Sequence, residues 1–107
     1  MHDYAEKRDF QRMAMECPAR FRMHNAEEIN GAIVKDLSSG GMLLWLEREI
    51  ELGQHLNIEV MPAKTITPSL SAEVTIIRCY ELEEGIWAAA CSIDNIFRED
   101  EVGPNFP

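Results

Sequence analysis

Two arginines near the start of the chain are spaced so that both could contact one anionic ligand. Arg8 and Arg12 lie four residues apart, and Lys7 directly precedes the first of them. A guanidinium offers a planar fork of donors that matches a phosphate, or the O6/N7 edge of guanine, in bidentate geometry. On its own, such a segment is more often a set of solvated surface charges, so its meaning depends on the residues further along the chain.

A second polar cluster, Asp36-Leu37-Ser38-Ser39-Gly40-Gly41, lies about two dozen residues after the arginines. A carboxylate can accept from the N1–H and N2–H2 groups of guanine, and a serine hydroxyl can donate or accept beside it. Asp36 and Ser38 are two residues apart, so in extended backbone they point to the same face. The two glycines can take positive φ in a tight turn, and Gly41 can let the backbone approach a ligand. The cluster alone would also suit an ordinary hairpin turn.

In this order, the two clusters resemble the RxxxR and (D/N)xSxxG motifs of the PilZ domain, a family that binds the bacterial second messenger cyclic di-GMP. The resemblance spans roughly residues 7–95 of a chain of 107 residues. It implies that an N-terminal arm carrying Arg8 and Arg12 folds over a barrel surface that carries Asp36, Ser38 and Gly41. Either motif alone is weak, but both in sequence, before a run of short strands, are fairly specific.

Lys7 and Arg78 extend the candidate ligand set. The resemblance implies that the residue before the first arginine influences whether one cyclic di-GMP or a stacked pair is held. One ligand carries two negative charges and a stacked pair carries four, so the extra cation at Lys7 favours the pair, although Glu6 and Asp9 partly offset it. Arg78 interrupts an otherwise apolar strand face and lies either beside the ligand or at the rim of the barrel.

The distribution of charge argues against general binding of DNA or RNA. The net charge is −9, and residues 36–107 carry thirteen acidic and four basic side chains, whereas residues 1–35 carry six of each. Phosphate backbones need a cationic footprint, which an acidic protein does not offer. A small group of cations on such a protein suits a small anionic ligand better.

Alternating apolar and polar residues predict six short strands. Turn signals every 8–12 residues between them favour an all-β fold, a small antiparallel barrel or sandwich, and the resemblance implies the six-stranded PilZ-like β-barrel. Pro18 lacks an amide donor, which predicts that the first strand is an edge strand or is bulged there. The expected strands cover residues 13–22, 29–37, 42–46, 56–60, 72–80 and 86–93.

The chain reads as one domain with two extensions. We expect residues 1–12 to form a flexible arm, residues 13–96 the barrel, and residues 97–107 an acidic tail that is either disordered or docked. No apolar run is long enough for a membrane helix, and no apolar leader is present, so we expect a cytoplasmic protein without membrane insertion. The three cysteines, Cys17, Cys79 and Cys91, read as small buried hydrophobes.

The inventory of side chains does not favour an enzyme or a metalloprotein. The three histidines are scattered, no metal-ligand spacing or phosphate loop is present, and no histidine base lies close to Asp36 and Ser38 in the pattern. We therefore expect a monomeric receptor, without a cofactor, that binds cyclic di-GMP and signals to an unidentified effector protein as its arm becomes ordered. The alternative is a ligand-free PilZ-like barrel that binds proteins.

The arginine motif yields a direct prediction. Changing Arg8→Ala or Arg12→Ala should weaken cyclic di-GMP binding at least about tenfold, because each removes a charge-assisted contact worth on the order of 1.5–3 kcal/mol. The barrel should stay folded, because both residues precede the first predicted strand. Isothermal titration calorimetry measures the affinities, and variants that bind like the parent would show that the arm is assigned wrongly.

Overall fold

The period-two patterns of the sequence produce six strands, each of which buries one side-chain face. The computed structural model describes residues 12–61 and 69–107, with the backbone alone for residues 12–15. The strands are β1 (Arg12–Met23), β2 (Ile29–Ser38), β3 (Gly41–Leu46), β4 (His55–Val60), β5 (Leu70–Glu83) and β6 (Ile86–Phe97).

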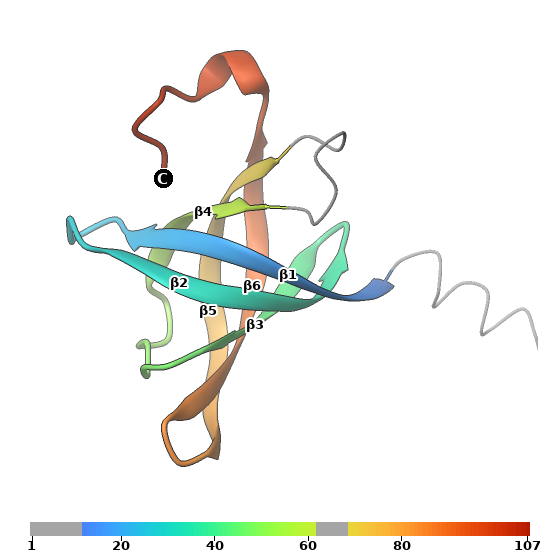
Figure 1. Ribbon diagram of the computed structural model, residues 1–107, viewed down its shortest axis with the longest axis vertical. Coiled ribbons are helices and arrows are strands. Elements are labelled where there is room, and N and C mark those ends of the chain that lie inside the picture. The colour runs from blue at the N-terminus through green and yellow to red at the C-terminus, as the bar shows by residue number, and fades with distance from the viewer. Residues whose placement is uncertain (1–11, 62–68) are drawn as a thin grey trace, which may run out of the picture.

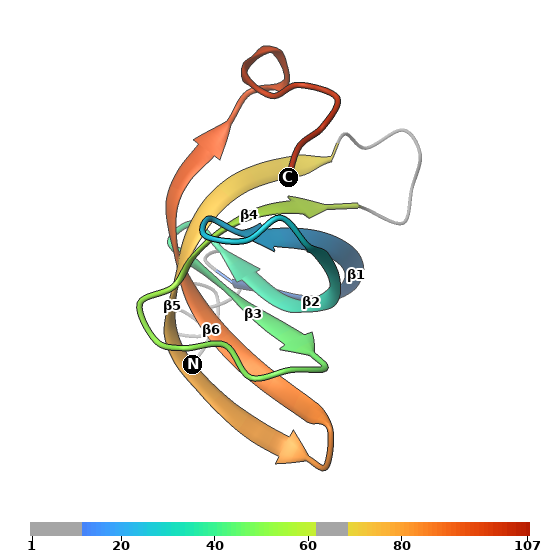
Figure 2. The ribbon, with the colours of Figure 1, turned by 90° about the vertical axis from the view of Figure 1, so that its left-hand side faces the viewer.

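The sheet closes on itself. The strands pair antiparallel in the order β1-β2-β3-β6-β5-β4, and β4 returns to β1 (Figures 1 and 2). This confirms the predicted all-β, six-stranded antiparallel barrel. Residues 1–11, which make up most of the predicted flexible arm, lie outside the described residues, and Arg12 is the first residue of β1.

Side chains from all six strands fill the interior of the barrel. Burial of a large apolar side chain contributes roughly 1.5–3 kcal/mol, so this inner layer supplies most of the drive for closure. The small side chains of Ala89 and Cys91 line the inner face of β6. The largest fully buried side chains within the strands are Phe21, Val34, Leu44, Leu56, Ile58, Val74 and Ile76.

β1 is not an edge strand, so that part of the prediction from Pro18 was wrong. β1 pairs with β2 along its length and with β4 from Ala19 to Met23. Pro18 lies just beyond the pairing with β4, where its carbonyl accepts from the amide of Met61 at 2.9 Å. A strand tolerates a missing amide at such an end. The register of β1 shifts between Ala14 and Cys17, directly before the proline.

Four further register shifts interrupt the strand pairing. β2 and β6 each have one extra residue, Lys35 and Asp94, and β5 has two, Ile77 and Leu82. A β-bulge of this kind leaves the extra residue unpaired and reverses the in-and-out phase of the residues after it. On β5 the effect is direct, since Ile77 is 55% exposed and Arg78, the next residue, is exposed as well.

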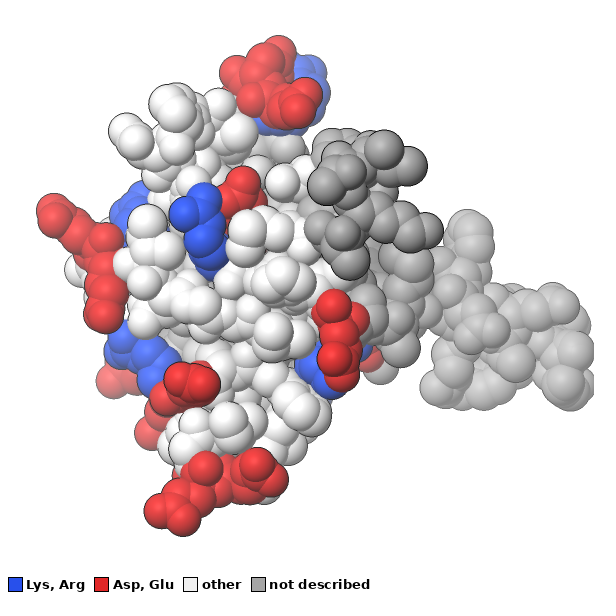
Figure 3. All heavy atoms as spheres, viewed as in Figure 1, with Lys and Arg blue, Asp and Glu red and all other residues white. Residues whose placement is uncertain are grey.

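The β5–β6 hairpin is longer than the barrel. Its turn is Glu84–Gly85, and Gly85 has φ 83°, a conformation that glycine adopts without strain. The turn lies between the two predicted strands 72–80 and 86–93. The end of the hairpin projects from the barrel on the side away from the C-terminal segment (Figure 1). Acidic side chains gather at that end of the molecule (Figure 3).

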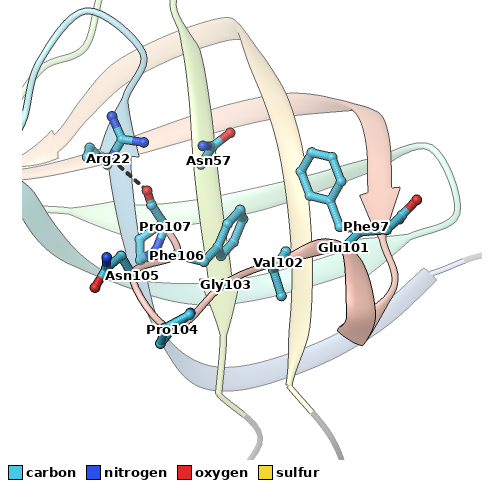
Figure 4. A pocket seen from close by; sticks show the side chains of 10 residues that line it. All are labelled: Arg22, Asn57, Phe97, Glu101, Val102, Gly103, Pro104, Asn105, Phe106 and Pro107. Atoms are coloured by element: carbon cyan, nitrogen blue, oxygen red, sulfur yellow. Dashed lines mark hydrogen bonds between the residues drawn. The ribbon is translucent and has the colours of Figure 1, made fainter.

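The C-terminal segment docks on the barrel, which settles the choice between a disordered and a docked tail. After the short 3-10 helix η1 (Glu99–Glu101), the chain turns back toward β1 and β4 (Figure 1). The ring of Phe106 meets Phe97 edge-on, with centroids 5.7 Å apart. Arg22 Nε donates to the main-chain oxygen of Pro107 at 2.6 Å, and the Pro107 side chain is buried (Figure 4). Among the described residues, no helix is long and apolar enough to span a bilayer.

Candidate functional site

Strand register arranges the outer surface of the barrel in rows. Directly opposed residues on antiparallel strands share a face of the sheet. One row crosses four strands as Asp36, Leu43, Ala90 and Arg78. The next row contains Gly41, Ser92 and Thr75, with Ser38 at the end of β2 beside it. Residues that are far apart in the sequence are therefore neighbours on this surface.

These rows enclose a pocket of about 380 Å³, a size suited to a small-molecule ligand. Asp36, Ser38, Gly41 and Arg78 all line it. The pocket therefore brings together every member of the predicted site whose side chain, or glycine backbone, is described. For Arg12 the described backbone lies opposite Ser38 in the β1–β2 register. Lys7 and Arg8 lie outside the described residues.

A bulge directs Asp36 into the pocket. Val34 is fully buried, so strict alternation would turn Asp36 inward as well. Lys35 is the extra residue between the two, and the shift leaves Asp36 half-buried on the outer face. Ser38 then falls on the same side, as its spacing from Asp36 predicted. Both residues therefore line the pocket.

Arg78 reaches the pocket for the same reason. The alternation of Val74 and Ile76 predicted that Arg78 would interrupt the apolar face of its strand. The bulge at Ile77 instead places Arg78 opposite Ala90 on the outer surface, where its side chain is exposed. Its assignment to the apolar face was therefore wrong, and its position in the pocket is a consequence of the register shift.

Gly41 is required by a close approach of two backbones and not by its own dihedral angles. The expectation of positive φ in this turn was wrong, because in the described residues only Gly53 and Gly85 have positive φ. A Cβ at Gly41 would lie 2.8 Å from the carbonyl oxygen of Cys91 on β6. The turn is held by Ser38 Oγ, which donates to the carbonyl of Gly41 at 3.3 Å, and by the amide of Ile93, which donates to that of Gly40 at 3.0 Å.

Charge around the pocket is nearly balanced. Of the described side chains that line it, Asp36 and Arg78 are the charged ones. Lys35 lies nearby, where its ammonium pairs with Glu16 and sits 4.2 Å from the ring centroid of Trp45. The hydrogen bond from Lys35 holds the pKa of the Glu16 carboxyl below its usual range. Binding of a multiply charged anion would need more cations than the described residues of the pocket supply.

Two further pocket residues, Tyr80 and Ser92, were not predicted. Tyr80 follows Arg78 by two residues and is 47% exposed on the same face, so its spacing from Arg78 was a usable signal. Ser92 lies beyond a run of three alanines on β6, and nothing in its immediate sequence marks it. The position of Ser92 beside the motif residues follows only from strand pairing, which places it opposite Gly41 and Thr75 on the adjacent strands.

The cysteines next to the pocket have a structural role. Cys91 lies under the pocket floor and is 2% exposed, and burial raises the pKa of its thiol to about 12. The thiol therefore stays protonated at neutral pH and is a poor nucleophile. Cys17 and Cys79 pack against the core from its edge. In residues 12–61 and 69–107, no group of His, Cys, Asp and Glu is arranged to hold a metal ion.

Another pocket is created by the docked C-terminal segment. It measures about 270 Å³, and the segment itself forms much of its wall (Figure 4). Its guanidinium, Arg22, is already bonded to the main-chain oxygens of Pro107 and Ala26. None of the residues in the two sequence motifs lines it. The pocket beside Asp36 is therefore the better candidate for a ligand site.

Comparison with known proteins agrees with the fold and the motifs. The PilZ domain family model matches residues 6–101. Among solved structures, the chain is similar to the Bacillus subtilis inhibitor of motility, MotI/DgrA, with a TM-score of 0.69 and 16% sequence identity. The similarity covers 85% of this chain and 44% of that one, so the chain corresponds to less than half of that protein. No curated protein sequence matches significantly.

Because the family model covers most of its length, the chain belongs to the PilZ domain family. PilZ domains are binding and adaptor domains and not enzymes. The fold, the family and the pocket residues thus agree with a binding module. The identity of the ligand and of any partner is a separate question.

The close approach at Gly41 predicts an asymmetric response of the two glycines of the turn. Gly41→Ala should lower the free energy of unfolding by about 1–3 kcal/mol, because the new methyl group meets the backbone of β6. Gly40→Ala is the matched control, since a Cβ there meets nothing within 4 Å and the change should stay within about 0.5 kcal/mol. Urea unfolding measures both, and equal stabilities would contradict the packing argument.

Proposed function

We propose that this PilZ domain is a receptor for cyclic di-GMP, which binds in the pocket between β2, β3, β5 and β6. One observation carries the proposal: Asp36 and Ser38 of β2 and Arg78 of β5 line a single pocket of suitable size. Two of these residues belong to the motif from which the sequence predicts a guanine contact. The third adds the kind of donor that a phosphate or a guanine edge requires.

The chemistry of the ligand suits the side chains that are present. Asp36 accepts from the N1–H and N2–H2 groups of a guanine, and Ser38 holds the turn beneath that base. Arg78 provides a guanidinium fork for a phosphate or for the O6/N7 edge of the second guanine. Gly41 has no side chain, so the floor of the pocket stays open.

The N-terminal arm supplies the missing positive charge. The described walls carry one carboxylate and one guanidinium, whereas cyclic di-GMP carries two phosphates. The arm enters β1 at Arg12, whose backbone lies opposite Ser38 at the edge of the pocket. Arg8 and Arg12, with Lys7, close over the ligand from that edge. Whether one molecule or a stacked pair is enclosed is set by how many phosphates these cations neutralise.

Closure of the arm provides the signal. A liganded arm presents a surface that the free protein lacks, and an effector protein can recognise it. One similar solved structure is named as an inhibitor of motility, which supports a regulatory role for a domain of this fold. We propose a cytoplasmic, monomeric adaptor of this general kind, with an effector that remains to be identified.

Titration with the nucleotide separates this receptor from a ligand-free interaction barrel. Isothermal titration calorimetry with cyclic di-GMP should give saturable binding, and the stoichiometry reports one molecule or a stacked pair. Cyclic di-AMP and GTP are the controls. Heat signals no larger for cyclic di-GMP than for GTP would favour the ligand-free alternative.

The role of Asp36 predicts selectivity for guanine. Adenine lacks the N1–H and N2–H2 donors, so cyclic di-AMP would forgo the hydrogen bonds that the carboxylate accepts from guanine, at a cost of roughly 1–3 kcal/mol. Cyclic di-GMP should bind more tightly than cyclic di-AMP by the factor in affinity that this free energy corresponds to. Asp36→Asn should reduce the difference in affinity between the two nucleotides. Asp100→Asn, in the C-terminal segment outside the pocket, is the matched control. Equal affinities of the parent for both nucleotides would remove Asp36 from this role.

Ordering of the arm predicts a local change in hydrogen exchange. On addition of cyclic di-GMP, amides of residues 5–13 should become protected, because contacts between the arginines and the phosphates hold the arm against the barrel. The central residues of β4 serve as an internal reference and should not change. An arm that is equally protected with and without ligand would leave no switch at this end of the chain.

A further inference from the structure

Ser92 occupies a position that neither the sequence motifs nor the family match assigns. It lies on β6, directly opposite Gly41 of β3 and Thr75 of β5. It is half-buried and lines the same pocket as Asp36 and Ser38. A hydroxyl at this point faces whatever the pocket binds, so the direction of its single proton decides what it can recognise.

Asp94 fixes the direction of that proton. Ser92 Oγ donates to Asp94 Oδ1 at 3.4 Å, and Thr75 Oγ1 donates to Asp94 Oδ2. Asp94 is the extra residue of the bulge in β6, which breaks the pairing with β5 at this point. Bulges of this kind re-aim a side chain, and here the carboxylate reaches the hydroxyl of Ser92 on its own strand and that of Thr75 on β5. Both of its oxygens accept.

His55 completes the chain of hydrogen bonds. Its Nδ1 lies 2.9 Å from Thr75 Oγ1. Because the one hydroxyl proton of Thr75 points to Asp94, Thr75 must accept from His55, and Nδ1 must therefore carry a proton. The donors run in one direction, from His55 to Thr75 and from Thr75 to Asp94. Ser92 donates to the same carboxylate from the pocket side.

We propose that Ser92 is a further ligand-contacting residue, which accepts a hydrogen bond from a donor on the guanosine unit of cyclic di-GMP. Asp94, Thr75 and His55 are positioning residues that keep its proton turned away from the ligand. The proposal rests on the proposed function. With its proton committed to Asp94, the Ser92 oxygen offers only lone pairs to the pocket, so its partner must be a donor. The ribose 2′-hydroxyl and the guanine 2-amino group are the two sources of such a donor.

The direction in which Asp94→Asn changes the ligand affinity separates a positioning role of Asp94 from simple electrostatic repulsion. Asp94 is an acid close to a pocket that would hold an anion, so loss of its charge should strengthen binding if only Coulomb repulsion acted. An amide at this position keeps one acceptor oxygen for the two hydroxyls of Ser92 and Thr75 and adds a donor, so Ser92 should lose its fixed orientation and binding should weaken instead. Asp94→Asn therefore gives opposite results under the two accounts. Asp100→Asn again removes a charge far from the pocket and should leave the affinity unchanged.

The test compares the parent protein with Ser92→Ala, Asp94→Asn and Thr75→Val. Calorimetric titration uses three nucleotides: cyclic di-GMP, its 2′-deoxy analogue and cyclic di-IMP, which lacks the 2-amino group. We expect each variant to lose about five- to tenfold in affinity for cyclic di-GMP. For Ser92→Ala, that loss should vanish with the one analogue that lacks the donor. In the absence of ligand, ¹⁵N NMR of the parent protein should show that Nδ1 of His55 carries a proton. In Thr75→Val, which lacks the hydroxyl acceptor, this tautomer should no longer be favoured.

The outcomes distinguish this inference from the function on which it rests. A parent protein that does not bind cyclic di-GMP would refute the proposed function itself. A parent that binds, together with a Ser92→Ala variant of equal affinity, would overturn only the role of Ser92. An equal loss for all three nucleotides, or tighter binding by Asp94→Asn, would also overturn it. If Ser92→Ala loses affinity for cyclic di-GMP but not for one of the two analogues, the contact of Ser92 is supported. The group that this analogue lacks is then the donor.

Discussion

Closure of the sheet between β1 and β4 is the constraint on which the rest of the structure depends. A closed barrel leaves no strand edge exposed, but it also encloses a narrow space. Barrels of about eight strands are only just wide enough for their own side chains, and this one has six. Residues such as Phe21, Leu44 and Ile58 fill that space completely. A ligand must therefore bind on the outer face, which the strands can furnish only by turning polar residues outward.

Bulges provide those outward residues without cost to the core. Asp36 and Arg78 each follow an extra residue, and Asp94 is itself one. At each of these shifts the side chains that face the core remain apolar, while a charged side chain is turned to the outer face of the sheet. The register shifts at Lys35 and Ile77 thus bring Asp36 and Arg78 to one pocket. Packing and binding are served by the same irregularities in the sheet.

The sequence predicted those parts of the molecule that derive from local pattern. The six strands could be read from alternation, and Asp36 with Ser38 from their spacing. Arg78 was placed on the apolar face, because alternation alone does not reveal an extra residue such as Ile77. Gly41 was expected to serve its own turn, whereas its absent side chain makes room for Cys91 on a strand some fifty residues away. Ser92 had no local signal at all, since its partners come from other strands.

The packing of Lys35 over Trp45 makes part of the outer face visible to spectroscopy. Trp45 is 38% exposed, and the ammonium of Lys35 lies above its indole ring. Lys35 directly precedes the pocket residue Asp36 in the sequence. Trp87, the other tryptophan, packs against the core from β6. Emission from an indole responds to nearby charge and to water, so the two rings report on different environments. Displacement of Lys35 would alter the signal of Trp45 and leave that of Trp87 as an internal standard.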